Sequence, residues 1–211
     1  MNLSEIRREY MKQSLSKSTV HNDPVKQFGK WYLEASDSNI TDPNAMTIAT
    51  ATSNGLPSAR IVLLKEYSHA GFMFYTNYLS RKGRHLEENP YAALLFFWPE
   101  LERQIRIEGM VEKVLPAVSE KYFNSRPRES QLGAWASQQS HLIENRKYLE
   151  QKYNEYKLRF IDNQIPRPEH WGGYLLKPSL FEFWQGRTSR LHDRIEYTFE
   201  SGSWQIARLA P

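Results

Sequence analysis

The sequence contains no cysteine among its 211 residues. This absence excludes disulfides, thiolate metal sites and cysteine nucleophiles. Histidine is present, but no two histidines have the His-x-His or His-x-x-x-His spacing that is common in metal sites. The six are His21, His69, His85, His141, His170 and His192. The sequence therefore predicts no metal centre.

Sequence motifs of several large enzyme classes are also missing. No GxGxxG or GxxxxGK[ST] pattern is present, so the sequence gives no support for dinucleotide or nucleotide binding of those kinds. No GxSxG elbow marks a serine nucleophile. No apolar run approaches the roughly 20 residues that a helix needs to cross a bilayer. The first residues, MNLSEIRREYMKQ, are charged and unlike a signal peptide. We expect a soluble, cytoplasmic protein without a membrane partner.

The charge excess is small, at a formal net charge of +4. Such an excess favours small anions bound at local sites as readily as it favours nucleic acid. Hydrophobic residues make up 40% and aromatic residues 13% of the chain, enough for a sizeable core. We expect one folded domain over residues 1–211.

Hydrophobic patterning predicts a mainly β protein. Asp23-Pro24 should begin a helix whose inner face carries Phe28, Trp31, Tyr32 and Ala35. Strand-like segments follow at residues 45–53, 58–67, 72–76, 91–98 and 103–115. A helical block occupies about residues 116–160, and three further strands complete the chain. Short connections between successive strands predict an antiparallel β-barrel with flanking helices.

Two motifs before the helical block could bind anions. RIVLLK (60–65) has a cation at each end, and in a regular strand Arg60 and Lys65 point to opposite faces. Ser80 can cap a helix that begins with Arg81-Lys82, where cations oppose the helix dipole unless an anion binds there. Charged strand ends and ordinary surface helices are the alternative explanations.

Two later motifs have the same ambiguity. Tyr122 and Arg126 are four residues apart, hence on one face of a helix, and with Ser130 they suit a phosphate ester. In FWQGRTSRLHDR (183–194), four cationic side chains fall within eight residues. In an extended loop Arg190 and His192 would share one face while Leu191 turns inward. A solvated turn explains either motif equally well.

Taken together, the motifs resemble those of the pyridoxamine 5′-phosphate oxidase family. The resemblance runs in order over nearly the whole chain, which makes it more specific than any single motif. It includes RREY (7–10), RIVLLK (60–65), FYTN (74–77), SRK (80–82), LERQ (101–104), YFNSRPRESQLGAW (122–135), SQQS (137–140), FWQG (183–186), RLHDR (190–194) and ARLAP (207–211).

The resemblance implies a split β-barrel that binds FMN at a homodimer interface, with residues 1–20 as an N-terminal lid and residues 116–160 as a helical insertion. It implies flavin contacts from Arg60, Ile61, Val62, Leu63, Leu64, Lys65, Tyr75, Thr76, Arg81, Lys82, Gln104, Gln139, Ser140, Trp184 and Arg194. It implies substrate contacts from Arg7, Tyr10, Lys65, Tyr122, Arg126, Ser130, Arg190 and His192.

The reaction implied is oxidation of pyridoxamine or pyridoxine 5′-phosphate to pyridoxal 5′-phosphate, with O2 as acceptor and H2O2 as product. Arg190 and His192 would act over the substrate ring as the catalytic pair. Because a flavin carries the redox chemistry, the protein itself needs no nucleophile or metal. No role follows for Arg187 or for residues 11–22.

Two other functions stay open at this point. One is a split-barrel protein that merely carries flavin, or a flavin reductase with another substrate. The five residues Tyr122, Arg126, Ser130, Arg190 and His192 weigh against it, because flavin binding alone would not require them. The other is a basic nucleic-acid-binding module, which the sequence pI of about 9.2 allows. Its cations are spread over the chain, however, and no nucleic-acid-binding signature is present.

Overall fold

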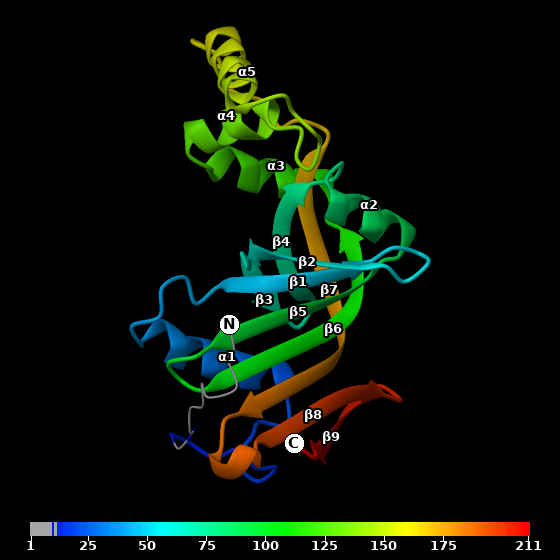
Figure 1. Cartoon of the computed structure of the whole chain (residues 1–211). Coiled ribbons are helices and arrows are strands. Elements are labelled where there is room, and N and C mark those ends of the chain that lie inside the picture. Colours follow the sequence, from blue (N-terminus) through cyan, green and yellow to red (C-terminus); the bar gives the residue numbers. More distant parts are fainter. Residues whose placement is uncertain (1–9, 11) are drawn as a thin grey trace.

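The computed structural model describes residue 10 and residues 12–211. Within these residues, nine strands form one antiparallel sheet that curls into a half-barrel (Figure 1). The strands are β1 (Ala45–Ala51), β2 (Pro57–Leu63), β3 (Glu66–Ser68), β4 (Gly71–Asn77), β5 (Tyr91–Trp98), β6 (Arg103–Lys113), β7 (Trp171–Gln185), β8 (Asp193–Glu200) and β9 (Ser203–Leu209).

Strand β7 pairs with three other strands, β6, β4 and β8, and so connects the parts of the sheet. The strand order is β2-β1-β5-β6-β7-β4-β3, and β8 also pairs with β7 and continues to β9. The first half of β7 pairs with β4, from Trp171↔Asn77 to Leu176↔Phe72. Its second half pairs with β8, from Leu180↔Thr198 to Gln185↔Asp193. One long strand therefore carries side chains to opposite ends of the molecule.

A bulge marks the point where β7 changes partners. The register between β6 and β7 shifts between Glu108 and Gly109, opposite Pro178. A Cβ on Gly109 would lie 2.0 Å from the carbonyl oxygen of Lys177, so the close approach of the two backbones requires glycine here.

Five α-helices and one short 3-10 turn are present in the described residues. They are α1 (Pro24–Ser36), α2 (Arg81–Glu88), α3 (Pro116–Ser125), α4 (Arg128–Ala136), α5 (Arg146–Arg159) and η1 (Thr188–Arg190). Helices α3, α4 and α5 gather at one end of the molecule, and β8 and β9 lie at the other end (Figure 1). No helix among the described residues is both long and apolar enough to span a membrane.

Helix α1 packs its apolar face on the sheet. Asp23 accepts hydrogen bonds from the backbone N–H groups of Val25 and Lys26, as an N-cap should. Phe28, on this face, is fully buried in a cluster of aromatic rings that includes Phe72 and Phe96. These contacts place the main core between α1 and the sheet.

The mainly β, antiparallel fold class is confirmed, and the differences from expectation lie at element ends. The expected strand over residues 58–67 is divided into β2 and β3. The backbone N–H of Leu64 donates to Asn44 on the β1 side, and that of Lys65 donates to Met73 in β4. Residues 64 and 65 therefore carry the chain from one edge of the half-barrel to the other. The alternation argument for Arg60 and Lys65 was wrong, because no regular strand joins them.

The helical block over residues 116–160 is present but interrupted. Helix α4 ends at Ala136 and α5 begins at Arg146. Arg126 lies beyond the end of α3, with extended backbone angles of φ −75° and ψ 149°. Its expected place on one helical face with Tyr122 was therefore wrong, since Pro127 disfavours the helical conformation for the residue before it.

Candidate active site

A basic pocket of about 940 Å³ lies between β2, β4, α2 and α4. Its described lining includes the five cationic residues Arg60, Lys65, Arg81, Lys82 and Arg126, and contains no aspartate or glutamate. Cations that gather without carboxylates repel one another, and an anionic ligand would remove that repulsion. The structure brings most of the expected residues together here, namely Arg60, Ile61, Val62, Leu63, Lys65, Tyr75, Thr76, Arg81, Lys82, Tyr122, Arg126, Ser130, Gln139 and Ser140.

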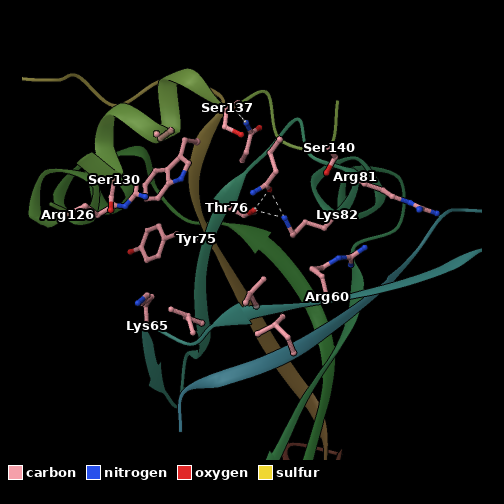
Figure 2. Close-up of a pocket in the computed structure, with 18 of the residues that line it drawn as sticks. Arg60, Lys65, Tyr75, Thr76, Arg81, Lys82, Arg126, Ser130, Ser137 and Ser140 are labelled. Atoms are coloured by element: carbon pink, nitrogen blue, oxygen red, sulfur yellow. Dashed lines mark hydrogen bonds between the residues drawn. The ribbon is translucent and has the colours of Figure 1, made fainter. Parts of the chain in front are cut away.

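The α2 end of the pocket is built around Lys82. Ser80 caps the helix, its Oγ accepting from the backbone N–H of Gly83 at 3.3 Å. The Lys82 ammonium is buried and donates to Thr76 Oγ1 at 2.9 Å and to Gln139 Oε1 at 2.7 Å (Figure 2). Burial, together with the charge of Arg60, lowers the pKa of Lys82 to about 8. This end of the pocket thus holds a desolvated cation whose hydrogen-bond acceptors among the described residues are all neutral, beside the free N–H groups of a helix N-terminus.

Arg60 is fixed to the sheet beside Lys82. Its Nη1 donates to Thr50 Oγ1 at 2.8 Å and to the carbonyl oxygen of Ser58 at 3.1 Å. Burial and the nearby Arg81 lower the pKa of its guanidinium. Arg60 therefore adds charge to the α2 end in a fixed position, and no carboxylate of the described residues pairs with it.

The α3–α4 end of the pocket is built around Arg126. Its guanidinium lies over the ring of Trp171, 4.6 Å from the centroid. Its Nη1 is buried and has no hydrogen-bond partner among the described residues. Burial lowers the pKa of Arg126. A buried N–H without an acceptor is costly, and an oxyanion at this end would satisfy it. Ser130 and Lys65 lie toward the same end of the pocket (Figure 2).

A flat aromatic wall lies beside the Arg126 end. Tyr122 stacks on Tyr75 at 3.9 Å between ring centroids, and Trp171 stacks on Tyr75 at 5.5 Å. Burial raises the pKa of Tyr75 to about 12, with smaller contributions from Glu66 and neighbouring tyrosines, so its phenol stays neutral. The pocket therefore combines two cationic ends with apolar, planar surfaces suited to aromatic ligands.

The remaining expected residues form a second group, the distal cluster, at the far end of β7. It comprises Gln104, Trp184, Arg190, His192 and Arg194. Gln104, Trp184 and Arg194 are neighbours across β6, β7 and β8. None of the five lines the basic pocket of the same chain. Trp171 and Trp184 are separated by roughly 40 Å of strand at about 3.3 Å per residue. One expected flavin contact, Leu64, also lies elsewhere, with its side chain buried in the main core.

Arg194 is held by a buried carboxylate. Its Nε and Nη2 donate to the two oxygens of Glu182 at 2.7 and 3.0 Å, and its Nη1 donates to the carbonyl oxygen of Ala210 at 2.8 Å. Glu182 is also paired with Arg106 at 2.6 Å. Although burial opposes ionisation of Glu182, its hydrogen bonds to Arg194 and Arg106 lower its pKa.

The loop that carries Arg190 and His192 is a tight turn. Ser189 and Arg190 have positive φ angles of 55° and 60°, a conformation that costs energy outside glycine. Leu191 is 70% exposed, so the expectation that it turns inward in an extended loop was wrong. The turn redirects the chain within three residues and places His192 against Trp184, at 4.6 Å between ring centroids.

Tyr10 belongs to the distal cluster as well. Its ring packs edge-on against Trp184 and His192, at 5.7 Å from each. A Cβ on Gly186 would lie 2.7 Å from the Tyr10 ring, so the absence of a side chain there makes room for it. Arg7, the other expected lid residue, lies outside the described residues.

Comparison with known proteins agrees with this architecture. Residues 32–160 match the family described as pyridoxamine 5′-phosphate oxidase, and residues 171–211 match the pyridoxine 5′-phosphate oxidase C-terminal dimerisation region. The chain belongs to the pyridoxamine 5′-phosphate oxidase family. Its relatives include proteins named pyridoxine/pyridoxamine 5′-phosphate oxidase from Cyanothece sp., 52% identical over all of this chain and 99% of the relative, and from Cupriavidus pinatubonensis, 55% identical over 99% of each.

A solved structure of the same fold is PhzG from Burkholderia lata 383, in complex with tetrahydrophenazine-1-carboxylic acid. It is 30% identical, with a TM-score of 0.87 over 92% of this chain and 95% of that chain. This likeness confirms the split-barrel fold that the sequence motifs implied.

Sequence reasoning overlooked several residues that shape the two groups. Trp171 supports Arg126, Glu182 holds Arg194, and the backbone of Arg187 contacts His192. Glu182 could have been found from its two-residue spacing to Trp184, which places both on one face of a strand. Arg187 could not, because its contact is made by a backbone N–H that any residue except proline carries.

Proposed function

We propose that the protein is an FMN-dependent oxidase that converts pyridoxamine 5′-phosphate and pyridoxine 5′-phosphate to pyridoxal 5′-phosphate. The observation that carries the proposal is a pocket with a cationic group at each end, no carboxylate in its described lining, and an unpartnered, buried Nη1 on Arg126. FMN and the substrate are both phosphate esters with planar rings, so they require two anion sites flanking an aromatic-lined space.

The α2 end suits the phosphate of FMN. Lys82, Arg81 and Arg60 would neutralise it, and the N–H groups at the start of α2 would donate to it. Strand β2 would lie along the ring system, since Ile61, Val62 and Leu63 line the pocket. When bound, the flavin takes two electrons from the substrate carbon and passes them to O2.

The Arg126 end suits the phosphate of the substrate. Arg126, Lys65, Ser130 and the Tyr122 hydroxyl supply the donors around that end. The reaction removes a hydride and a proton from the alcohol of pyridoxine phosphate, giving the aldehyde and, with O2, hydrogen peroxide. For pyridoxamine phosphate, water then replaces the nitrogen, which leaves as ammonia.

A homodimer would complete each site. The distal cluster lies too far along β7 to reach the basic pocket of its own chain. Four of its five residues, all except Gln104, fall within the dimerisation region that the family description names. We infer that Trp184, Arg194, Gln104, Arg190 and His192 of one protomer meet the basic pocket of its partner. In a C2 dimer two such sites form at once.

The main alternative is a flavin enzyme of the same fold that acts on a different substrate. PhzG is described with a tetrahydrophenazine carboxylic acid, whereas the relatives that are 52–55% identical carry names for phosphorylated vitamin B6 substrates. The unpartnered Arg126 Nη1 favours a ligand with an oxyanion at the α3–α4 end. A cytoplasmic location stays a prediction from composition.

Two measurements test the proposal. The protein purified after flavin supplementation should be yellow and hold about one FMN per chain, because the described residues of each chain supply one set of groups suited to the FMN phosphate, at the α2 end of the basic pocket. Under anaerobic conditions, pyridoxine 5′-phosphate should bleach the flavin band, whereas dephosphorylated pyridoxine should do so far more slowly. A colourless protein that fails to bind FMN in titration would overturn the proposal, as would equal bleaching by both compounds.

A further inference from the structure

The imidazole of His192 is held through one of its two nitrogens. The backbone N–H of Arg187 donates to Nδ1 of His192, with 3.1 Å between the nitrogens. A backbone amide can only donate, so Nδ1 must offer its lone pair. A neutral ring in this position therefore carries its proton on Nε2.

The surroundings of His192 favour the neutral ring. Burial, followed by the charge of Arg190, lowers its pKa. The rings of Trp184 and Tyr10 also pack against the imidazole, and Arg187 contacts it through its backbone N–H. The adjacent residue in the chain, Asp193, carries a carboxylate that lies 3.6 Å from the Arg187 side chain. That carboxylate accepts from Arg208 at 2.7 Å and from the backbone N–H of Leu15 at 2.9 Å, and no contact pairs it with the imidazole. Among the described residues, no carboxylate forms an ion pair with the His192 imidazole.

The N–H of Arg187 is aimed by a fixed backbone. On one side, Gly186 donates its N–H to the carbonyl oxygen of Glu102 at 2.8 Å. On the other side, Leu191 donates to the carbonyl oxygen of Thr188 at 3.1 Å, which closes the turn. The Arg187 side chain adds a bond to the carbonyl oxygen of Gln13 at 3.1 Å and lies 3.6 Å from Asp193. The bond to His192 is therefore part of a rigid turn.

We propose that Arg187 is a positioning residue whose backbone N–H locks His192 in the Nε2–H form, which makes His192 a hydrogen-bond donor to the substrate and not the group that accepts its proton. The locked form is independent of any ligand. The donor role rests on the proposed function, because that function places His192 beside the substrate ring.

Ring nitrogen NMR tests the lock directly. In protein labelled with 15N in its histidine rings, long-range 1H–15N correlation distinguishes the two neutral forms from the cation, and the His192→Asn spectrum assigns the signal by its loss. At pH 7.5 we expect the Nε2–H pattern for His192. Arg187→Ala is the matched control, since it removes the side-chain contacts and keeps the N–H, so the pattern should persist. An Nδ1–H pattern or a doubly protonated ring in the wild type would overturn the proposal.

A pair of substitutions tests the donor role. The amide of glutamine reaches the position of Nε2 and can donate from there, whereas asparagine reproduces only the Nδ1 side. We expect His192→Asn to slow anaerobic flavin reduction by about tenfold to a hundredfold, the effect of losing one hydrogen bond to a charged or polarised acceptor. We expect His192→Gln to recover most of that loss, with the pH profile between pH 7 and 9 unchanged.

Equal losses in the two variants, accompanied by disappearance of a titration seen in the wild type, would identify His192 as a base and overturn the donor role. If the wild type shows no flavin reduction by either phosphorylated substrate, the proposed function fails instead. The NMR result on Arg187 and His192 stands or falls separately from that outcome.

Discussion

Arg126 differs from the arginines that form buried ion pairs in what surrounds its guanidinium. Arg103 is paired with Glu34 at 2.5 Å, and Arg106 and Arg194 share Glu182. Arg126 has aromatic rings beside it and a buried Nη1 without an acceptor. These three arginines have carboxylate partners within the chain, whereas the unsatisfied Nη1 of Arg126 is available to an acceptor that comes from solution.

Replacement of Arg126 should therefore affect the substrate more than the flavin. We expect Arg126→Ala to lower kcat/KM for pyridoxine 5′-phosphate by roughly thirty- to a thousand-fold, corresponding to about 2–4 kcal/mol for a lost charge-assisted contact. FMN affinity, measured by fluorescence titration, should change little. Arg128→Ala is the control, because Arg128 binds the carbonyl oxygens of Phe160 and Asn163 and should affect stability alone. A loss of FMN affinity with unchanged substrate kinetics would mean that the two phosphate sites are exchanged.

Lys82 should make FMN binding depend on pH. Its pKa in the apoprotein is lowered to about 8, so the ammonium is charged below that pH and neutral above it. The FMN phosphate is a dianion above about pH 6. Affinity for the apoprotein should therefore be highest between these values and fall about tenfold to a hundredfold by pH 10. Titrations over this range should show the fall in wild type, whereas Lys82→Met should bind weakly at every pH. A flat profile in the wild type would contradict this role of Lys82.

The contribution of Lys82 to the stability of the apoprotein should rise with pH, whereas FMN affinity falls. The unfolded chain binds a proton at Lys82 up to about pH 10.5, whereas the folded chain releases it near pH 8. Between these values the unfolded state holds more protons, so the contribution of Lys82 to the free energy of unfolding rises with pH. The difference between wild type and Lys82→Met in urea unfolding would reveal this contribution.

At the scale of elements, the β6–β7 bulge allows β7 to serve two halves of the sheet. We expect Gly109→Ala to destabilise the protein by about 1–3 kcal/mol or more, because backbone atoms must move to admit the Cβ. Gly133→Ala is the matched control. It adds the same methyl group where no atom lies within 4 Å, inside α4, and should stabilise the helix by about 0.5–1 kcal/mol. Thermal unfolding of the two variants should move in opposite directions, and equal melting temperatures would contradict the bulge argument.

Elements with strong local signals could be predicted from the sequence. The Asp23-Pro24 start of α1 and the Ser80 cap of α2 are both present, because each depends on a side chain next to the backbone that it caps. The division between β2 and β3 could not be predicted. It depends on Leu64 and Lys65 finding partners on two different strands, Asn44 and Met73, which are distant in sequence. For Arg126 the same limit applies only in part. The extended backbone before Pro127 follows from a local rule, whereas the contact of its guanidinium with Trp171 depends on a residue distant in sequence.

At the scale of the whole molecule, the residues that the family resemblance assigns to one site lie in two groups, near opposite ends of β7. The motifs predict which side chains form the site, but a motif contains no information on which chain supplies each one. The structure separates Lys82 and Arg126 from Trp184 and Arg194 along the length of β7. A monomer with both groups intact would hold two half-sites. Full flavin occupancy in a monomer, measured by light scattering and absorbance, would contradict the shared site.

Mixed dimers give the sharper test of a shared site. Lys82→Met damages the basic pocket, Arg194→Met damages the distal cluster, and each homodimer should therefore be nearly inactive. In a mixed dimer, one site receives both damaged halves, and the other receives the intact pocket of one protomer and the intact cluster of its partner. Equal mixing after unfolding and refolding should make about half of the dimers mixed and restore about a quarter of all sites. If each site were built from a single chain, every site would contain one damaged half, and mixing would restore nothing. Flavin reduction measured before and after mixing separates the two arrangements, and refolding each variant alone shows whether the procedure itself changes activity.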